Sequence, residues 1–167
     1  MQNSKIKKKI ITLIGPTACN KTSTAVHLIK KFPISIIGVD SVQIYKRFNI
    51  GSAKPPKEIL KKYKHHLVDS TDPENIFSVK DFYDQAYRIV MQAHSNNRIP
   101  LLVGGTMMYF NALFKGINDI PEGNEAIREE LQRELDNRGV DKLFNELKEI
   151  DPESAKTIKE NDKQRIM

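Results

Sequence analysis

The clearest indication of the fold is the segment "KIITLIGPTACNKTSTAVHLIKKF", residues 9–32. Its first part, "KIITLIG", is a short apolar run that ends at a glycine, which predicts a buried strand. Its last part, "KTSTAVHLIKKF", predicts an amphipathic helix. Four apolar residues share one face of that helix: Ala25, Leu28, Ile29 and Phe32. A strand, a glycine-containing turn and a helix in this order form the local setting of a phosphate-binding loop.

The turn itself, "GPTACNKT", nearly matches the phosphate-loop pattern G-x-x-x-x-G-K-[ST]. Gly15, Lys21 and Thr22 fall in place, but Asn20 stands where the second glycine belongs. Asn is the non-glycine residue that best tolerates a positive φ, so we expect Asn20 to adopt one and the loop to keep its shape. Backbone N–H groups at the start of the helix would then attract a phosphate, and Lys21 would add a positive charge. The alternative is a chance match in an ordinary strand-turn-helix.

The rest of the first two-thirds of the chain alternates between strands and helices. "PISIIGVDS" predicts a strand that ends at Asp40, and "IPLLVGGT" predicts another that ends in two glycines. Between them lie a long polar connection with a short possible strand at "HHLVD" and a helix that opens at Ser78 with Asp81 three residues on. The helix "TMMYFNALFK" closes at Gly116. This alternation predicts an α/β fold, a parallel sheet with helices on both faces and the apolar strands in its centre.

From residue 117 onward the apolar strands stop, and helices carry the rest of the chain. "NEAIREELQRELDNRG" has a cap at Asn124 and a stop at Gly139, and "VDKLFNELKEI", "PESAKTIKEN" and the beginning of "DKQRIM" follow as further helices. We therefore expect an α/β core over residues 1–116 and a separate helical region over residues 117–167.

Two polar residues follow strands of the expected sheet and are candidates for chemistry. Asp40 lies where a strand ends, near the phosphate loop; there a carboxylate either binds a metal ion or takes a proton, unless it only caps a turn. Thr106 follows Gly104 and Gly105, which would let a ligand approach the backbone. The alternative for Thr106 is the N-cap of the next helix.

Composition narrows the class of protein. Hydrophobic residues make up 39% of the 167 residues, enough for a packed core. Cys19 is the single cysteine, so no internal disulfide can form, which fits a reducing cytoplasm. The lysines before the apolar run at residues 10–14 are not followed by a cleavage site, and no stretch reaches a membrane-spanning length.

Charge is distributed unevenly along the chain. Residues 1–100 hold 17 Lys and Arg against 7 Asp and Glu, whereas residues 101–167 hold 10 against 14. A basic first part suggests a polyanionic partner such as a nucleic acid. The alternative is that runs such as "KPPKEILKKYKHH" are solvated surface.

Taken together, five segments resemble the tRNA dimethylallyltransferases, also called tRNA isopentenyltransferases. The segments are "GPTACNKT", "DSVQIYKRFNIGSAKP", "HHLVD", "RIPLLVGGTMMYFNAL" and "NDKQRI", and the resemblance runs in order from Ile11 to the last residue. Two departures stand out. The family loop usually reads Ser-Gly where this chain has Cys19-Asn20, and the chain stops within the "NDKQR" helix, so the resemblance implies a truncated C-terminus.

The resemblance implies a P-loop NTPase-like core with a helical insertion for tRNA that begins near residue 117. It implies transfer of a dimethylallyl group from dimethylallyl diphosphate to N6 of an adenosine next to the anticodon, with Mg²⁺ as cofactor. In the phosphate-loop pattern, the Thr22 hydroxyl can hold Mg²⁺ or a phosphate oxygen. The loop residues would bind the diphosphate: Gly15, Pro16, Thr17, Ala18, Cys19, Asn20, Lys21 and Thr22.

The resemblance also assigns roles outside the loop. Asp40 matches the general base, and Thr106 matches the hydroxyl placed between the attacking nitrogen and the leaving oxygen. The residues aligned with tRNA contacts are Asp40, Ser41, Val42, Gln43, Thr106, Arg128, Gln164 and Arg165. For the last three, salt bridging on a helix surface is the alternative. The expected partners are the tRNA anticodon stem-loop and dimethylallyl diphosphate, bound by a cytoplasmic monomer without a membrane.

Two other classes of function remain open at this point. A small-molecule kinase with the same loop would need a mobile lid that carries arginines across the phosphates. No arginine lies between Asn49 and Phe77, which weakens that reading. The third possibility is a non-catalytic RNA-binding fragment.

Overall fold

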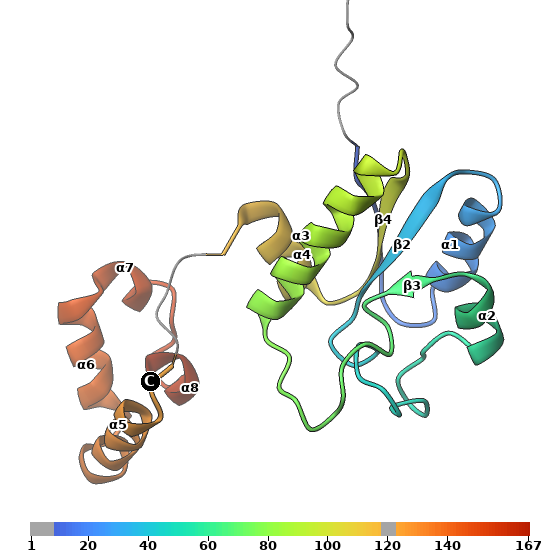
Figure 1. Cartoon of the computed structure of the whole chain (residues 1–167). Coiled ribbons are helices and arrows are strands. Elements are labelled where there is room, and N and C mark those ends of the chain that lie inside the picture. Colours follow the sequence, from blue (N-terminus) through green and yellow to red (C-terminus); the bar gives the residue numbers. More distant parts are fainter. Residues whose placement is uncertain (1–8, 118–122) are drawn as a thin grey trace, which may run out of the picture. The chain divides into compact units, whose positions relative to one another are not determined.

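The computed structural model describes residues 9–117 and 123–167 of the chain. It divides into two compact units, Met1–Asn118 and Asp119–Met167. The first unit contains all four strands of the described sheet (Figure 1), and the second contains helices. Within the described residues, no helix is both long and apolar enough to cross a bilayer.

The sheet of the first unit is parallel throughout, with the strand order β1-β4-β2-β3. β2 (Ile34–Val39) and β4 (Ile99–Gly104) pair along their full lengths in the centre of the sheet, and β2 is buried at every position. The two-residue β3 (His65–His66) pairs with β2. The carboxyl ends of the three longer strands lie at one edge of the sheet, where α/β folds of this kind bind their ligands.

β1 (Ile11–Ile14) pairs with β4 alone and forms one edge of the described sheet. The prediction of a buried, central strand is therefore wrong for this segment. The side chains of Ile11 and Ile14 keep 42% and 45% of their surface exposed. The apolar run predicts a strand correctly, but it does not contain the strand order, which decides how much of the strand is covered.

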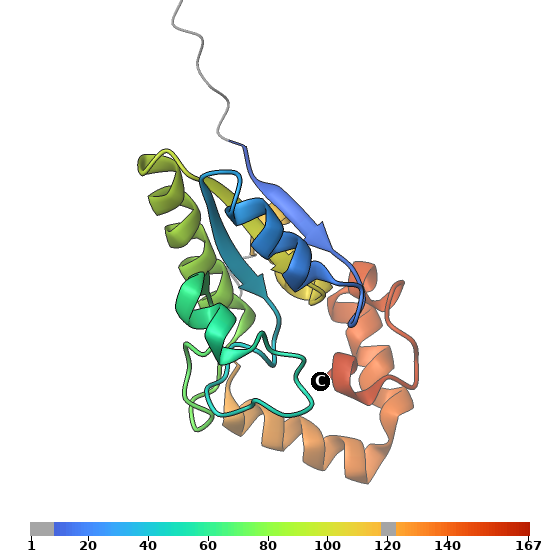
Figure 2. The same cartoon turned by 90° about the vertical axis from the view of Figure 1, so that its right-hand side faces the viewer.

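Helices cover both faces of the sheet, as the sequence predicts. Successive strand residues point to opposite faces, so strands as apolar as β2 need cover on both. α1 (Lys21–Ile29) lies over one face of the sheet (Figure 2). Its Ala25 packs there with Ile36 and Leu101. α3 (Val79–Ser95) and α4 (Met107–Lys115) cover the opposite face. There the residues that pack together include Ile37, Val39, Leu102, Phe82, Val90, Tyr109 and Phe110.

α1 is shorter than the periodicity predicts. The helix ends at Ile29, and Phe32 lies beyond it with 51% of its surface exposed. The reason is local: the ring of Pro33 disfavours helical backbone at the residue before it. Phe32 therefore does not share the buried face of Ala25.

α3 begins with the capping box that the sequence predicts. The Ser78 hydroxyl accepts a hydrogen bond from the Asp81 amide, and the Asp81 carboxylate accepts one from the Ser78 amide. The Ser78 hydroxyl also donates to the Asp81 carboxylate at 2.6 Å. This bond, together with the one from the Ser78 amide, lowers the pKa of Asp81 below its usual value of 3.8. The box is therefore fully formed at neutral pH, and its contribution to stability is lost only as the pH falls through that lowered pKa.

We expect Ser78→Ala to lower the free energy of unfolding by about 1 kcal/mol at pH 7, because the amide of Asp81 loses its acceptor. Urea denaturation measures the change. Ser95→Ala, at the other end of the same helix, is the matched control and should stay within about 0.5 kcal/mol of the unmodified chain. Equal losses in the two variants would show that the box contributes nothing specific.

The connection between β2 and α3 contains a helix that the sequence did not predict, α2 (Lys57–Lys62). It follows Pro56 and none of its residues is fully buried, so the segment lacks the apolar periodicity that marks longer helices. Beyond α2, the chain runs back beside the segment after β2, where Tyr45 and Thr71 form an isolated parallel bridge.

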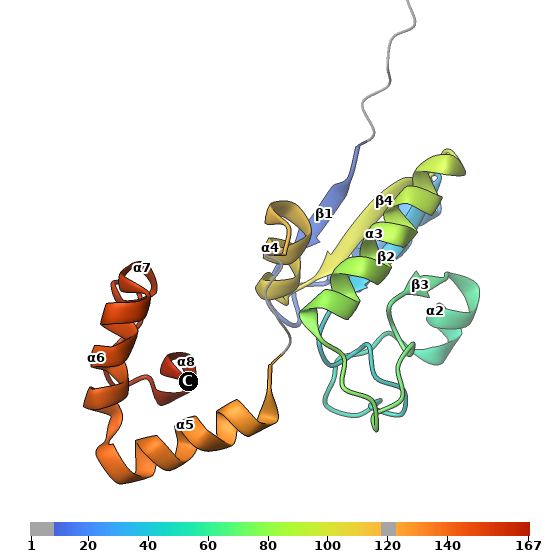
Figure 3. The same ribbon diagram turned by 60° about the vertical axis from the view of Figure 1, so that its left-hand side comes forward.

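The second unit consists of α5 (Glu125–Arg138), α6 (Val140–Ile150), α7 (Pro152–Ala155) and α8 (Lys163–Ile166), which Figure 3 shows. α6 packs against each of the other three helices. The predicted cap at Asn124 is confirmed, since its side chain accepts from the amides of Ala126 and Ile127.

The helix predicted over "PESAKTIKEN" is wrong beyond its first turn, because α7 ends at Ala155. The Thr157 hydroxyl donates to the Ser154 carbonyl, and such local side-chain bonds compete with helical ones. The cap at Asp151 is present, with its carboxylate accepting from the Ser154 amide.

Candidate functional site

The phosphate-loop candidate, residues 15–22, connects the end of β1 to the start of α1. Asn20 is the N-cap residue of α1 and has φ 58° and ψ 23°, so the predicted left-handed conformation is confirmed. Ala18, two residues earlier, also has a positive φ of 66°. Non-glycine residues seldom adopt this conformation, and strained backbone of this kind concentrates at ligand sites.

The conformation at position 20 leads to a prediction. Asn20→Val should lower the free energy of unfolding by about 1–2 kcal/mol, because a β-branched residue fits the left-handed region poorly. Asn20→Gly is the matched variant and should change stability by less, since glycine accepts a positive φ without steric cost. Urea denaturation of both variants tests this, and equal stabilities would show that the position is unstrained.

The side chain of Lys21 folds back onto the phosphate loop. Its Nζ atom donates to the carbonyl oxygen of Gly15 at 2.8 Å and to that of Pro16, and it lies 3.6 Å from Sγ of Cys19. The ammonium is therefore held inside the loop by backbone carbonyls. An anion that enters the loop would meet a positive charge already in place, at the N-terminus of a helix.

Asp40 follows β2 directly and is half-buried. Its Oδ1 accepts from the backbone amides of Val42 at 2.9 Å and Gln43 at 3.1 Å, so the carboxylate does cap the turn that it begins. Both of these bonds use one oxygen. The turn cap and a chemical role are therefore compatible, because Oδ2 can face the adjoining pockets.

Thr106 follows the two glycines at the end of β4. Gly104 has no room for a side chain, since a Cβ atom there would lie 2.0 Å from the carbonyl oxygen of Val39. The Thr106 hydroxyl makes no cap bond to α4, although Thr106 occupies the N-cap position. Its Oγ1 instead accepts from the amide of Ser41 at 3.1 Å, so Thr106 is tied to the segment that begins at Asp40.

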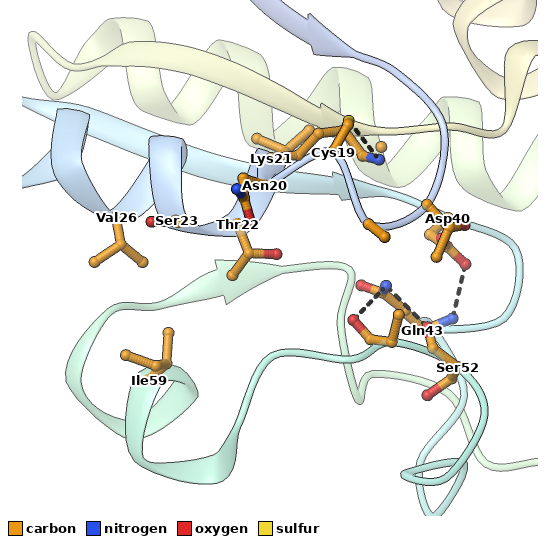
Figure 4. A pocket seen from close by; sticks show the side chains of 15 residues that line it. Cys19, Asn20, Lys21, Thr22, Ser23, Val26, Asp40, Gln43, Ser52 and Ile59 are labelled. Atoms are coloured by element: carbon orange, nitrogen blue, oxygen red, sulfur yellow. Dashed lines mark hydrogen bonds between the residues drawn. The ribbon is translucent and has the colours of Figure 1, made fainter.

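Two pockets adjoin the loop and share Thr17, Lys21 and Asp40. The first has a volume of about 460 Å³ and is drawn in Figure 4. The second has a volume of about 530 Å³. It brings Lys21 and Asp40 together with Thr106, and its other lining residues are Ile14, Gly15, Pro16, Thr17, Ser41, Val42, Gly105 and Met107.

The far wall of the first pocket was missed by the sequence analysis. It is formed by Ser52, Ala53 and Ile59. Figure 4 shows Ser52 and Ile59 across the pocket from the loop residues Asn20 and Thr22. Ser52 and Ala53 belong to the motif "GSAKP", which contributed to the resemblance without receiving a role. Ile59 lies on α2, the helix whose signal is too weak to find in the sequence.

Next to the site, α4 contributes a neutral phenol. Burial raises the pKa of Tyr109, and the charges of Tyr45, Asp40 and Asp81 act in the same direction. The Tyr109 ring stacks on Phe82 with 4.2 Å between centroids. This tyrosine therefore supports the sheet face below the site and remains protonated at neutral pH.

Three of the predicted tRNA contacts lie in the second unit. Arg128 is on α5, whereas Gln164 and Arg165 are on α8, and all three side chains are exposed. Arg165 pairs with Asp162, the N-cap residue of α8, with 3.4 Å between Nε and Oδ2. The surface salt bridge considered as the alternative is thus present for Arg165.

The chain is similar in sequence to a family model and to curated proteins. A family model described as IPP transferase matches residues 43–167. The chain is 45% identical over 158 residues to a tRNA dimethylallyltransferase of Dichelobacter nodosus, an alignment that covers 95% of this chain and 50% of that protein. It is 44% identical over 161 residues to the tRNA dimethylallyltransferase of Legionella pneumophila, with coverages of 96% and 51%.

Solved structures show the same fold. The full-length tRNA isopentenylpyrophosphate transferase from Bacillus halodurans is 38% identical, with a TM-score of 0.64, and the match covers 96% of this chain and 53% of that one. A eukaryotic dimethylallyltransferase acting on tRNA is 26% identical, with a TM-score of 0.80 and coverages of 95% and 40%. The chain spans about half the length of the curated relatives it matches.

Proposed function

Because the chain belongs to the IPP transferase family, we propose that the protein carrying it transfers a dimethylallyl group from dimethylallyl diphosphate to N6 of a tRNA adenosine next to the anticodon. One observation carries the chemistry of this proposal: Lys21, Asp40 and Thr106 line a single pocket of about 530 Å³. The reaction needs a charge for the leaving diphosphate, a base for the attacking amine and a group between them, and these three residues supply one each.

The leaving group is the first requirement. As the allylic carbon–oxygen bond breaks, negative charge grows on the diphosphate. The backbone N–H groups of the loop, which Pro16 lacks, and the Lys21 ammonium stabilise this charge at the N-terminus of α1. To do so, Lys21 exchanges its bonds to the Gly15 and Pro16 carbonyls for bonds to phosphate oxygens.

The attacking amine is the second requirement. N6 of adenine must lose a proton as it bonds to the allylic carbon, and Asp40 accepts that proton through Oδ2 while Oδ1 keeps its bonds to Val42 and Gln43. The Thr106 oxygen accepts from Ser41, which leaves its own proton free to donate. That proton can stabilise the leaving oxygen.

The residues present fit Mg²⁺ as a cofactor held mainly through the substrate. Within the described part of the chain, no three His, Cys, Asp or Glu side chains gather into a metal site. Mg²⁺ commonly binds substrate phosphates with one or two protein oxygens and several waters. The Thr22 hydroxyl, which lines the first pocket, would hold the ion, and the ion would add positive charge to the departing diphosphate.

The adenosine must leave its base stack to reach this site. Val42 and Met107 line the second pocket and expose 45% and 51% of their surfaces, which offers apolar contact to a base or to the dimethylallyl chain. We expect the first unit to bind the adenosine of the anticodon stem-loop, and we expect Arg128, Gln164 and Arg165 of the second unit to be further tRNA contacts. A monomer in the cytoplasm, where tRNA is found, suffices for this chemistry.

Mass spectrometry of tRNA tests the function directly. A transcript is incubated with dimethylallyl diphosphate, Mg²⁺ and the protein that carries these 167 residues. Gain of one dimethylallyl group on the adenosine next to the anticodon supports the proposal, and a transcript with guanosine at that position is the control. ATP turnover without transfer would support a kinase, and tRNA binding without either reaction would support a non-catalytic RNA-binding protein.

A further inference from the structure

An ion pair with a buried lysine adjoins the Ser52–Ala53 part of the pocket wall and has no part in the chemistry described so far. The Lys54 side chain is 3% exposed, and its Nζ lies 2.6 Å from Oδ1 of Asp69, whose side chain is 35% exposed. Nζ also donates to the carbonyl oxygen of Tyr45 at 2.7 Å. Lysine is seldom buried unless it is paired, because desolvation of the ammonium is costly. The other ion pairs of the described residues are much more exposed at their basic partner, such as Lys46 with Asp72.

The pair closes a ring of hydrogen bonds around Gln43. Lys54 directly follows Ser52 and Ala53, whose carbonyl oxygens accept from Nε2 of Gln43 at 3.1 and 3.2 Å. On the other side of the ring, the amide of Asp69 donates to the carbonyl oxygen of Gln43 at 3.1 Å. The chain therefore contacts Gln43 from two directions, and the Lys54–Asp69 pair joins them.

Two residues of this ring have strained backbone. Ala53 has φ 51° and Asp69 has φ 52°, both in the left-handed region. Non-glycine residues persist in that region only where the surrounding structure holds them. The Lys54–Asp69 pair, which joins Asp69 to the residue that follows Ala53, supplies such a constraint.

Gln43 connects the ring to the proposed base, because its amide donates to Oδ1 of Asp40. We propose that Lys54 and Asp69 are positioning residues that hold the Asp40 carboxylate and the Ser52–Ala53 wall in place beside the phosphate loop. This inference rests on the proposed function for the role of Asp40. In this proposal, neither Lys54 nor Asp69 contacts the substrates, and both act through the position of Asp40.

The rival reading is a purely structural ion pair, whose loss would destabilise the first unit as a whole. The two readings differ in a double variant. Lys54→Met leaves the Asp69 carboxylate without its partner, whereas Lys54→Met/Asp69→Asn removes both charges and should recover much of the lost stability. Neither variant restores the link between the two sides of the ring. The double variant should therefore regain stability without regaining the position of the Asp40 carboxylate.

The matched control is Lys46→Met. Lys46 pairs with Asp72 at 3.0 Å in the same part of the chain, but the two side chains are 44% and 48% exposed. The same substitution there removes an ion pair without touching the ring. We expect the control to keep its melting temperature, its transfer rate and its affinity for pyrophosphate.

Three measurements on the protein that carries this chain test the proposal: melting temperature, single-turnover transfer at saturating substrates, and hydrogen exchange at the amides of residues 41–43. We expect Lys54→Met to reduce transfer at least tenfold and to speed exchange at residues 41–43 at least tenfold, with α3 unaffected. In the double variant the melting temperature should return toward that of the unmodified protein while transfer stays at least tenfold low.

If the double variant recovers both its melting temperature and its transfer rate, the proposal is overturned. So would unchanged exchange at residues 41–43 in Lys54→Met. If the unmodified protein itself transfers no dimethylallyl group, the proposed function fails, and the exchange measurement still decides whether the pair holds the segment around Gln43. Calorimetric titration with inorganic pyrophosphate adds a reading that needs no turnover, since loss of the pocket wall should weaken this binding several-fold.

Discussion

Replacing Asp40 with asparagine should slow dimethylallyl transfer by a factor on the order of 10² or more, while the affinity for tRNA changes little. Asparagine retains an oxygen in the position of Oδ1, so the bonds from Val42 and Gln43 can survive and the turn should keep its shape. What the variant loses is the ability to take the amine proton. Single-turnover rates at saturating substrates measure this loss apart from binding.

The pH dependence of the same rate identifies the role of Asp40. If the carboxylate is the base, transfer by the unmodified protein should fall in acid, because a protonated carboxylate cannot accept the amine proton. That acidic limb should vanish in Asp40→Asn. If Asp40 instead holds Mg²⁺ on the diphosphate, the variant should lose diphosphate affinity and recover part of its rate at high Mg²⁺.

A third outcome would remove Asp40 from the chemistry. If the residue only caps its turn, the rate and both affinities should stay near those of the unmodified protein, with a stability loss of about 1 kcal/mol. Asp72→Asn is a suitable control, because this carboxylate lies in an exposed pair with Lys46. It should leave the transfer rate and its acidic limb unchanged.

Lys21→Ala should weaken the binding of dimethylallyl diphosphate by roughly 10- to 100-fold, which corresponds to the 1.5–3 kcal/mol of a hydrogen bond to a charged group. The affinity for tRNA should fall much less. The physical reason is the position of the ammonium, which the carbonyl oxygens of Gly15 and Pro16 hold within the loop. Calorimetric titration with each ligand separately measures the two effects.

The control for Lys21→Ala is Lys30→Ala. Lys30 is the C-cap residue of α1 and is exposed, so its removal takes away one positive charge at the opposite end of the same helix. A uniform effect of charge on diphosphate binding would appear in both variants. Equal losses of diphosphate and tRNA affinity in Lys21→Ala would mean that this lysine only supports the loop structure.

The features that the sequence predicts well depend on neighbours along the chain. The left-handed conformation of Asn20 follows from the tolerance of asparagine for positive φ, and the capping box at Ser78 follows from the spacing to Asp81. The apolar runs of β2 and β4 predict buried strands because such runs fit strands covered on both faces.

The features that the sequence does not predict depend on contacts between distant residues. The exposure of β1 follows from its place in the strand order, which no local pattern contains. The Thr106 hydroxyl bonds to Ser41 rather than to its own helix, and only the fold brings these residues together. The pairing of Lys54 with Asp69 likewise requires the chain to return beside the end of β2. The structure brings Lys21, Asp40 and Thr106 together in one pocket, and the chemical role of each of them remains a prediction.

The edge formed by β1 has a consequence for the colloidal behaviour of the chain. In the described sheet, β1 has hydrogen-bonding groups on the side away from β4 that no strand uses, and Ile10, Ile11 and Ile14 are each at least 40% exposed beside them. No charged side chain interrupts residues 10–16. Such an edge is a template on which another strand can add, and natural proteins usually guard theirs with charges or proline. We therefore expect the 167-residue chain, taken by itself, to associate through this edge at high concentration, and we expect a single lysine at an outward position of β1 to oppose that association.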